Sequence, residues 1–178
     1  MNLQSLGLRT AWISLFLIGI MQSSCGVYSF SGVATNAKTM SLPEFYNNAD
    51  LGPANMGQTF TNSLKNYFIQ NTSLSIIPEE GELQLEGEIT DFRLTQVAPT
   101  STGDPTQPTL ASATRITITV KVTFVNTLDD KQDFKNKTFS FYKDFTNEQN
   151  LIDVQDRLVK DIFDRIINDI FNATVANW

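Results

Sequence analysis

One segment in the first half of the chain carries apolar residues at the spacing of an α-helix. This stripe comprises Met56, Phe60, Leu64, Tyr67 and Phe68. Gly52-Pro53 precedes it, and proline suits the first position of a helix, where an N–H would have no partner. The helix is therefore predicted to begin at Pro53 and to end near Asn71. Its solvated face is expected to consist of Gln58, Thr61, Asn62, Lys65 and Asn66.

The C-terminal segment contains a longer helical pattern. Thr146 and Gln149 have the spacing of a capping box, which predicts the start of the helix. Acidic and basic residues four positions apart predict ion pairs on its exposed side, Asp153/Arg157, Asp156/Lys160 and Asp161/Arg165. Such pairs contribute a few tenths of a kcal/mol each, far less than a buried apolar face, so the helix is expected to lie on a sheet. That face consists of Leu151, Val154, Leu158, Val159, Ile162, Phe163, Ile166, Ile167, Ile170 and Phe171.

Two later segments alternate apolar and polar residues, which is typical of antiparallel strands with one solvated face. Residues 134–145 show the alternation with Phe139, Phe141 and Phe145, after a polar turn at 127–133. Residues 113–126 show it most regularly. Their inward face is expected to comprise Ile116, Ile118, Val120, Val122 and Phe124, and their outward face Arg115, Thr117, Thr119, Lys121 and Thr123.

Residues 83–97 form a third long strand in which the alternation changes phase. Leu83, Leu85 and Ile89 share one face, but Phe92 and Leu94 then have the opposite parity. A regular strand would expose half of these apolar residues, so a β-bulge is predicted near Thr90–Asp91.

Two shorter strands and one long loop complete the pattern. Residues 38–46 are predicted to be a strand with Met40, Leu42 and Glu44 on one side, and Pro43 favours a position at the sheet edge. Residues 74–78 are a short strand candidate. Residues 98–112, rich in Pro, Ser and Thr, are long for a hairpin loop; they are either a disordered excursion or a loop that contacts a partner.

These elements together predict an α+β fold. We expect a two-layer sandwich, with two helices packed on one face of a mostly antiparallel four- to five-stranded sheet. The other face would carry Thr, Lys and Arg side chains and be open to water or to a partner.

The N-terminal segment has the features of an export signal. Arg9 is the only charged residue before position 25, and residues 11–21 are an apolar run, too short to span a bilayer as a helix. Cys25, the only cysteine, follows two serines and cannot form an internal disulfide. Residues 22–25 resemble a lipobox, so Cys25 is predicted to be the site of lipid attachment. An ordinary signal peptide beside an unrelated cysteine is the alternative.

The predicted organisation is therefore a lipoprotein signal peptide at 1–24, a lipidated tether at 25–36 and a single α+β domain at 37–178. Residues 25–178 carry 12 basic and 19 acidic side chains, a formal charge of −7. This acidity argues against nucleic acid as the main partner. The chain has no histidine, and an acylated Cys25 would leave no free thiol, so neither catalysis nor a metal or cofactor is expected.

Several segments, taken in their order along the chain, resemble the LptE family of lipopolysaccharide-assembly lipoproteins in its Bacteroidota form. They are residues 25–32, 60–74, 83–99 and 115–124, together with the closing Asn177-Trp178. The resemblance implies a non-catalytic lipoprotein on the periplasmic side of the outer membrane. It also implies a complex with the LptD β-barrel, a position as a plug in the barrel lumen, and a role in inserting lipopolysaccharide into the outer leaflet. Residues 26–30 contain no acidic export signal, which by resemblance favours retention on the periplasmic side.

Lipopolysaccharide carries phosphates, so basic side chains near the polar sheet face are candidate contacts. Those on strands are Arg93, Arg115 and Lys121, and those around the last hairpin are Lys131, Lys135 and Lys137. They are alternatively ordinary solvated charges interleaved with acidic residues. The competing function is that of a periplasmic lipid- or ligand-binding adaptor lipoprotein without a barrel partner.

Overall fold

The structure, a computed structural model, describes residues 36–98 and 112–176, all within the unit formed by residues 31–178. Cys25, the predicted signal peptide and the interior of the predicted loop 98–112 lie outside the described residues, as do Asn177 and Trp178. In chain order the elements are β1 (Thr39–Ser41), β2 (Tyr46–Asn47), α2 (Met56–Asn71), β3 (Ser75–Ile77), β4 (Leu83–Val97), β5 (Ala113–Asn126), the 3₁₀ turn η1 (Asp130–Gln132), β6 (Phe134–Thr146) and α3 (Leu151–Thr174).

The strands form one six-stranded sheet in the order β3-β1-β4-β5-β6, and β2 pairs with β4 beside β1. The long strands pair in antiparallel fashion, β4 with β5 and β5 with β6. The short strands are parallel to their neighbours, β1 to β3 and β4, and β2 to β4. The sheet is therefore mixed but mostly antiparallel, with most of its pairing in the three long strands.

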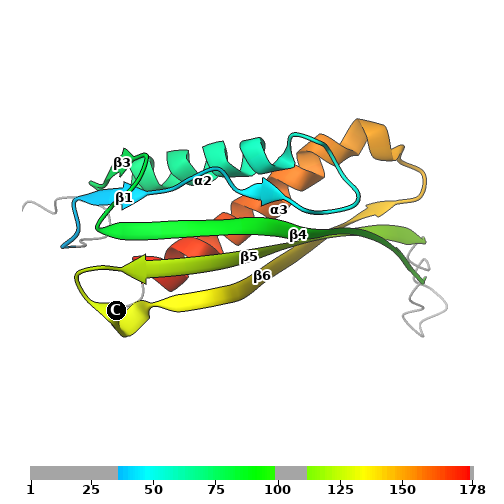
Figure 1. Ribbon diagram of the computed structural model, residues 1–178. Coiled ribbons are helices and arrows are strands. Elements are labelled where there is room, and N and C mark those ends of the chain that lie inside the picture. Colours follow the sequence, from blue (N-terminus) through cyan, green and yellow to red (C-terminus); the bar gives the residue numbers. More distant parts are fainter. Residues whose placement is uncertain (1–35, 99–111, 177–178) are drawn as a thin grey trace, which may run out of the picture. The chain divides into compact units, whose positions relative to one another are not determined.

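Both helices cover the same face of the sheet (Figure 1). Aromatic side chains join the two layers. The ring of Phe60 in α2 lies 5.0 Å from Phe163 in α3 and 5.1 Å from Phe45, which precedes β2. The inward residues of β5 and all the predicted apolar residues of α3 except the half-buried Leu151 are buried against this interface. The predicted two-layer α+β fold is thus confirmed, but the sheet has six strands instead of the predicted four or five, because the predicted strand 38–46 divides into β1 and β2.

The bulge predicted in β4 is also confirmed. The register between β4 and β5 shifts between Ile89 and Asp91. Ile89 and Phe92 are both buried as a result, although they have opposite parity along the strand. Leu94, predicted to be inward, is more than a third exposed and lies three residues before the end of β4.

A second irregularity, not predicted, lies in β6. The β5–β6 register shifts between Val122 and Phe124, and Asn136 adopts a positive φ of 52°. Phe134 and Phe139 therefore both face the helices despite their odd spacing, and their ring centroids are 6.1 Å apart.

The prediction of one strand over 38–46 is partly wrong. Two short strands form instead, and the alternation breaks at Pro43, so that Phe45 turns inward while Glu44 is exposed. The ring of Phe45 lies over Gly87 of β4, where a Cβ would be only 2.5 Å from Cε1 of Phe45. The absence of a side chain at Gly87 is what makes room for this ring.

The predicted start and solvated face of the first helix need correction. Asn55 is the N-cap residue of α2, and Pro53 lies in the preceding turn, where its carbonyl accepts a hydrogen bond from Met56 N–H. Thr61, predicted to be solvated, is 2% exposed. Its hydroxyl accepts a hydrogen bond from Phe45 N–H at 2.9 Å and donates one to the Gly57 carbonyl at 2.7 Å.

The predicted details at the start and surface of the C-terminal helix are also partly wrong. Asn150, not Thr146, caps α3, and its side chain accepts a hydrogen bond from Ile152 N–H at 3.1 Å. Lys160 pairs with Asp164 at 2.6 Å, and Arg165 with Asp169 at 3.3 Å. Lys160 and Arg165 thus pair with the acid one turn later and not with the acid one turn earlier, and among the described residues the predicted pair Asp153/Arg157 does not form.

Candidate functional site

The face of the sheet away from the helices is polar, and we call it the open face. It consists of the outward side chains of β4, β5 and β6. The register places them in rows across the three strands, which from one end are Thr95-Arg115-Asp144, Arg93-Thr117-Tyr142, Asp91-Thr119-Ser140 and Glu88-Lys121-Thr138.

Arg115 is the most firmly held cation of the open face. Its Nε and NH2 donate to the two carboxylate oxygens of Asp144, at 2.7 and 2.9 Å. Its guanidinium also stacks on the ring of Tyr142, 3.7 Å from the centroid. The hydrogen bond from Arg115 holds the pKa of Asp144 below its ordinary value, and the same bond raises the pKa of Arg115. A third of the Arg115 side chain remains exposed, so this fixed guanidinium can still donate to an anionic ligand.

Arg93 lies in the row next to that of Arg115, and its side chain is more exposed. Its NH2 contacts the carboxylate of Asp91 at 2.8 Å, two residues earlier on the same strand, while 69% of its side chain is exposed. Arg93 is opposite Thr117, and Arg115 is opposite Thr95, so the two arginines are diagonal neighbours. Such positions are about 7–8 Å apart. The register therefore places Arg93 and Arg115 in adjacent rows at one end of the open face, where Arg93 turns to Asp91 of β4 and Arg115 to Asp144 of β6.

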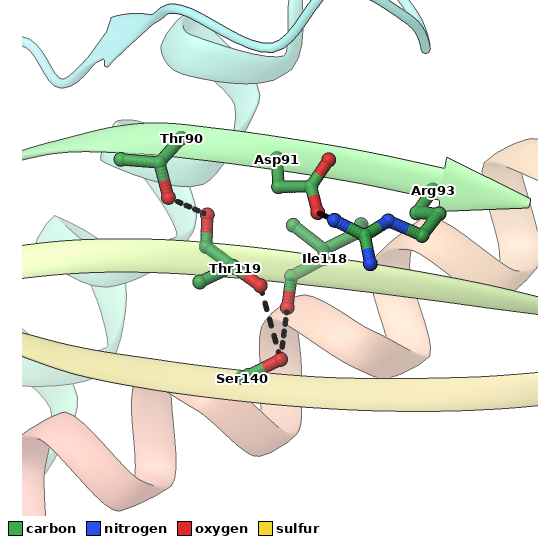
Figure 2. Close-up of polar contacts among 6 residues, drawn as sticks. All are labelled: Thr90, Asp91, Arg93, Ile118, Thr119 and Ser140. Carbon is green, nitrogen blue, oxygen red and sulfur yellow. Dashed lines mark hydrogen bonds and ion pairs between the residues drawn. The ribbon is translucent and has the colours of Figure 1, made fainter.

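The centre of the open face is held by hydroxyl groups (Figure 2). Thr90 donates to the Thr119 carbonyl at 3.3 Å, and the hydroxyls of Thr119 and Ser140 are 3.1 Å apart. Ser140 also donates to the Ile118 carbonyl at 3.1 Å. These hydrogen bonds link β4, β5 and β6 beside Arg93. They stabilise the strand positions from which the two arginines project.

Lys121 lies elsewhere, in an acidic environment. It is opposite Glu88 and borders a hollow of about 400 Å³ that Glu44 and Glu86 also line. Glu88 accepts a hydrogen bond from the Asn48 amide. Three carboxylates around one ammonium make this end of the open face unfavourable for a phosphate.

The three lysines around the last hairpin do not lie beside Arg93 and Arg115 on the open face. Lys131, in η1, pairs with Asp129 at 3.1 Å and is 81% exposed. Lys135 is exposed next to the bulge in β6. Lys137 points to the helix side of the sheet, with its Nζ 5.1 Å from the centroid of Phe134. Of the six predicted cations, only Arg93 and Arg115 are therefore neighbours on the open face.

Sequence reasoning missed the residues that orient these two arginines. Asp91 precedes Arg93 by two positions, so both lie on one face of a strand, and this spacing was available as a signal. The pairing of Arg115 with Asp144 and Tyr142 depends on the β5–β6 register, which the unpredicted bulge shifts.

Two general properties bear on the class of protein. In the described ranges, neither helix is long and apolar enough to cross a membrane. Residues 36–98 and 112–176 also bring together no three His, Cys, Asp or Glu side chains in an arrangement suited to a metal ion.

A family model described as lipopolysaccharide-assembly, LptE, matches residues 37–174, which include every helix and strand of the structure. The chain belongs to the LptE family. Its role is accordingly lipopolysaccharide assembly, as a lipoprotein, and it acts as an assembly factor and not as an enzyme. No curated protein matches the chain.

Solved structures are similar to this LptE-family chain at low sequence identity. A protein from Xanthomonas campestris has 8% identity and a TM-score of 0.50, over 82% of this chain and 87% of that one. A minor lipoprotein from Acinetobacter baumannii has 13% identity and a TM-score of 0.48, over 79% and 94%. A hypothetical protein from Chlamydia trachomatis has 13% identity and a TM-score of 0.47, over 80% and 100%. At such identities the likeness concerns the fold alone.

Proposed function

We propose that this chain is the lipid-anchored, periplasm-facing subunit of an outer-membrane complex with an LptD-like β-barrel. In this complex it occupies the barrel lumen as a plug and binds lipopolysaccharide during its insertion into the outer leaflet. The observation that carries the proposal is the family match over residues 37–174.

The surface chemistry of the domain supports the role of a plug. The interiors of large membrane barrels are polar and wet, so a plug needs a polar exterior. The open face offers hydroxyl groups and paired charges. The exposed side of α2 adds uncharged polar residues, namely Gln58, Thr59, Asn62, Asn66 and Gln70.

The paired arginines supply the proposed lipopolysaccharide contact. Arg115 is held in place by Asp144 and Tyr142, while the exposed Arg93 beside it can reach toward a ligand. Guanidinium groups bind phosphate oxygens in a bidentate manner, and the phosphates of lipopolysaccharide offer such oxygens. We therefore assign the phosphate contact to Arg93 and Arg115 before Lys121, Lys131, Lys135 or Lys137.

Cys25 is the proposed lipid attachment site, after removal of a signal peptide at residues 1–24. Residues 25–36 would then form the tether to the single domain at 37–178. A fully extended tether of that length spans at most about 40 Å. The lipid thus keeps the domain near the inner surface of the outer membrane, and contact with the barrel supplies the second attachment that stable anchoring needs.

Co-purification tests the complex. An affinity tag at the C-terminus of the full chain should recover a large β-barrel protein in a fixed ratio from detergent-solubilised outer membranes. The matched control is an unrelated tagged lipoprotein, which should recover none. Recovery of the tagged chain alone, under conditions that preserve other outer-membrane complexes, would exclude the plug. Lipopolysaccharide binding by that solitary chain would then favour the adaptor function.

A further inference from the structure

Strand β6 is a long open edge of the sheet. It has thirteen residues, whereas the other strands that pair on one side only are short: β3 has three residues and β2 has two. In the described part of the chain, β6 pairs with β5 alone. An edge strand presents unpaired backbone N–H and C=O groups on its free side, and a further strand can bind them.

The helix-side residues of β6 follow a regular chemical pattern. Lys137, Phe139, Phe141 and Lys143 pair with inward residues of β5 and so share one face. Two lysines six positions apart thus enclose two phenylalanines. Phe141 is only half-buried, and Arg165 of α3 lies 5.8 Å from its ring centroid. A further strand beside β6 would cover the exposed part of Phe141 and lie against both lysines.

The edge is also basic within an acidic protein. Three lysines lie on β6, and its one acid, Asp144, is bound to Arg115 on the open face. The chain as a whole has a formal charge of −6. Lysines on an edge strand disfavour pairing with a basic or identical strand. They favour an acidic one.

We propose that an extended acidic segment of the partner barrel pairs with β6 and adds a strand to the sheet. It would place carboxylates opposite Lys137 and Lys143, and apolar residues opposite Phe139 and Phe141. Backbone hydrogen bonds would supply affinity, and the four side chains would set the register. This inference rests on the proposed function, because the partner is the barrel.

A second copy of the chain fits the edge less well. In antiparallel self-pairing centred on Ser140, Lys137 of each copy would lie opposite Lys143 of the other. Like charges directly opposite each other destabilise a strand pair. The charge pattern therefore selects an acidic partner segment over a homodimer.

Hydrogen exchange followed by mass spectrometry tests the added strand. In the free full chain, the β6 amides that do not bond to β5 should exchange rapidly at every protein concentration, and they should become protected in the complex with the barrel. Protection in the free chain would overturn the proposal: a concentration-dependent effect would indicate a second copy, and a concentration-independent one a segment of the same chain.

Charge reversal tests the register. Lys137→Glu with Lys143→Glu should lower recovery of the barrel about tenfold or more. The control is Lys65→Glu with Lys160→Glu, which alters the net charge by the same amount but on the two helices. It should change recovery of the barrel less than about twofold. If the first pair unfolds the chain, Lys137→Gln with Lys143→Gln replaces it. Equal effects of the two pairs would overturn the inference.

The two proposals fail in distinguishable ways. If the wild-type chain recovers the barrel but the β6 amides remain unprotected in the complex, the added strand is wrong and the proposed function stands. If no barrel is recovered, both are wrong.

Discussion

The ring of Phe45 packs directly against the backbone of Gly87, in the space that a side chain at this position would occupy. A Cβ at Gly87 would lie 2.5 Å from Cε1 of Phe45 and would also clash with the Lys121 carbonyl oxygen. Phe45 in turn contacts Phe60 of α2, so Gly87 determines how closely the first helix approaches the sheet.

Gly87→Ala should therefore destabilise the domain. The added methyl group must displace the Phe45 ring or the β5 backbone, and such overpacking costs about 1–3 kcal/mol. Urea unfolding followed by circular dichroism measures the change. Glu86→Ala, at the neighbouring exposed position, is the control and should stay within about 0.5 kcal/mol of the wild type. An unchanged midpoint for Gly87→Ala would show that the ring does not occupy this space.

Thr61→Val should also be destabilising, although the two side chains have nearly the same shape. Valine cannot accept the hydrogen bond from Phe45 N–H, which is buried. A buried donor left without a partner costs about 1–3 kcal/mol. Thr59→Val, at an exposed position of the same helix, controls for the helix propensity of valine. Equal unfolding free energies for the two variants would contradict the assigned role of the Thr61 hydroxyl.

These two sites show where the sequence pattern was sufficient and where it was not. The long strands, both helices and the β4 bulge follow from apolar periodicity, because each buries one continuous face. Thr61 was misassigned because periodicity counted only apolar side chains, and its hydroxyl is buried by the turn at Phe45. That turn depends on Pro43 breaking the strand and on the space above Gly87, a tertiary contact that local spacing does not reveal.

The candidate site was likewise predictable only in part, because strand alternation shows which face a residue lies on but not which residue lies opposite it. Alternation along β5 placed Arg115 and Lys121 on the outward face, as observed. Their different surroundings depend on cross-strand register. The β6 bulge could have been predicted from the odd spacing of Phe134 and Phe139, the same signal that revealed the bulge in β4. Without the β6 bulge the register between β5 and β6 was unknown, so Asp144 could not be identified as the partner of Arg115.

The Arg115–Asp144 pair should make stability depend on pH. The pKa of Asp144 is lowered in the folded state by the hydrogen bond from Arg115, from an ordinary value of 3.8. A group with a depressed folded pKa stabilises the protein above its unfolded pKa, and this contribution disappears as the pH falls through the folded pKa.

A double-mutant cycle isolates this contribution. The coupling energy between Arg115→Gln and Asp144→Asn, from urea unfolding, should be favourable at pH 7 and should diminish below about pH 4 as Asp144 is protonated. Because both side chains are about a third exposed, high salt should also reduce the coupling at pH 7. A coupling energy that stays constant between pH 7 and pH 2.5 would contradict the ion pair.

The basic residues should differ in their effect on lipopolysaccharide binding. Arg93→Gln with Arg115→Gln should weaken binding about tenfold or more, because two charge-assisted contacts are lost. Lys131→Gln with Lys135→Gln, which removes the same charge from the hairpin, should have a much smaller effect, and so should Lys121→Gln. Fluorescence titration with lipopolysaccharide at fixed salt measures this. Similar losses for both double variants would indicate only a general electrostatic attraction.

Cys25→Ser should release the protein from the membrane without unfolding it. The described part of the domain begins at Asn36, and the described core begins at Ala37, eleven or more residues after Cys25. With a cleavable signal peptide for export, the variant should therefore unfold at the wild-type urea midpoint. In cells that lack the barrel it should be soluble in the periplasm, whereas the wild type should sediment with the outer membrane. In cells that contain the barrel, the variant should still co-purify with it, because the domain supplies that contact. A Cys25→Ser protein that stays in washed membranes without the barrel would show that another part of the chain binds lipid.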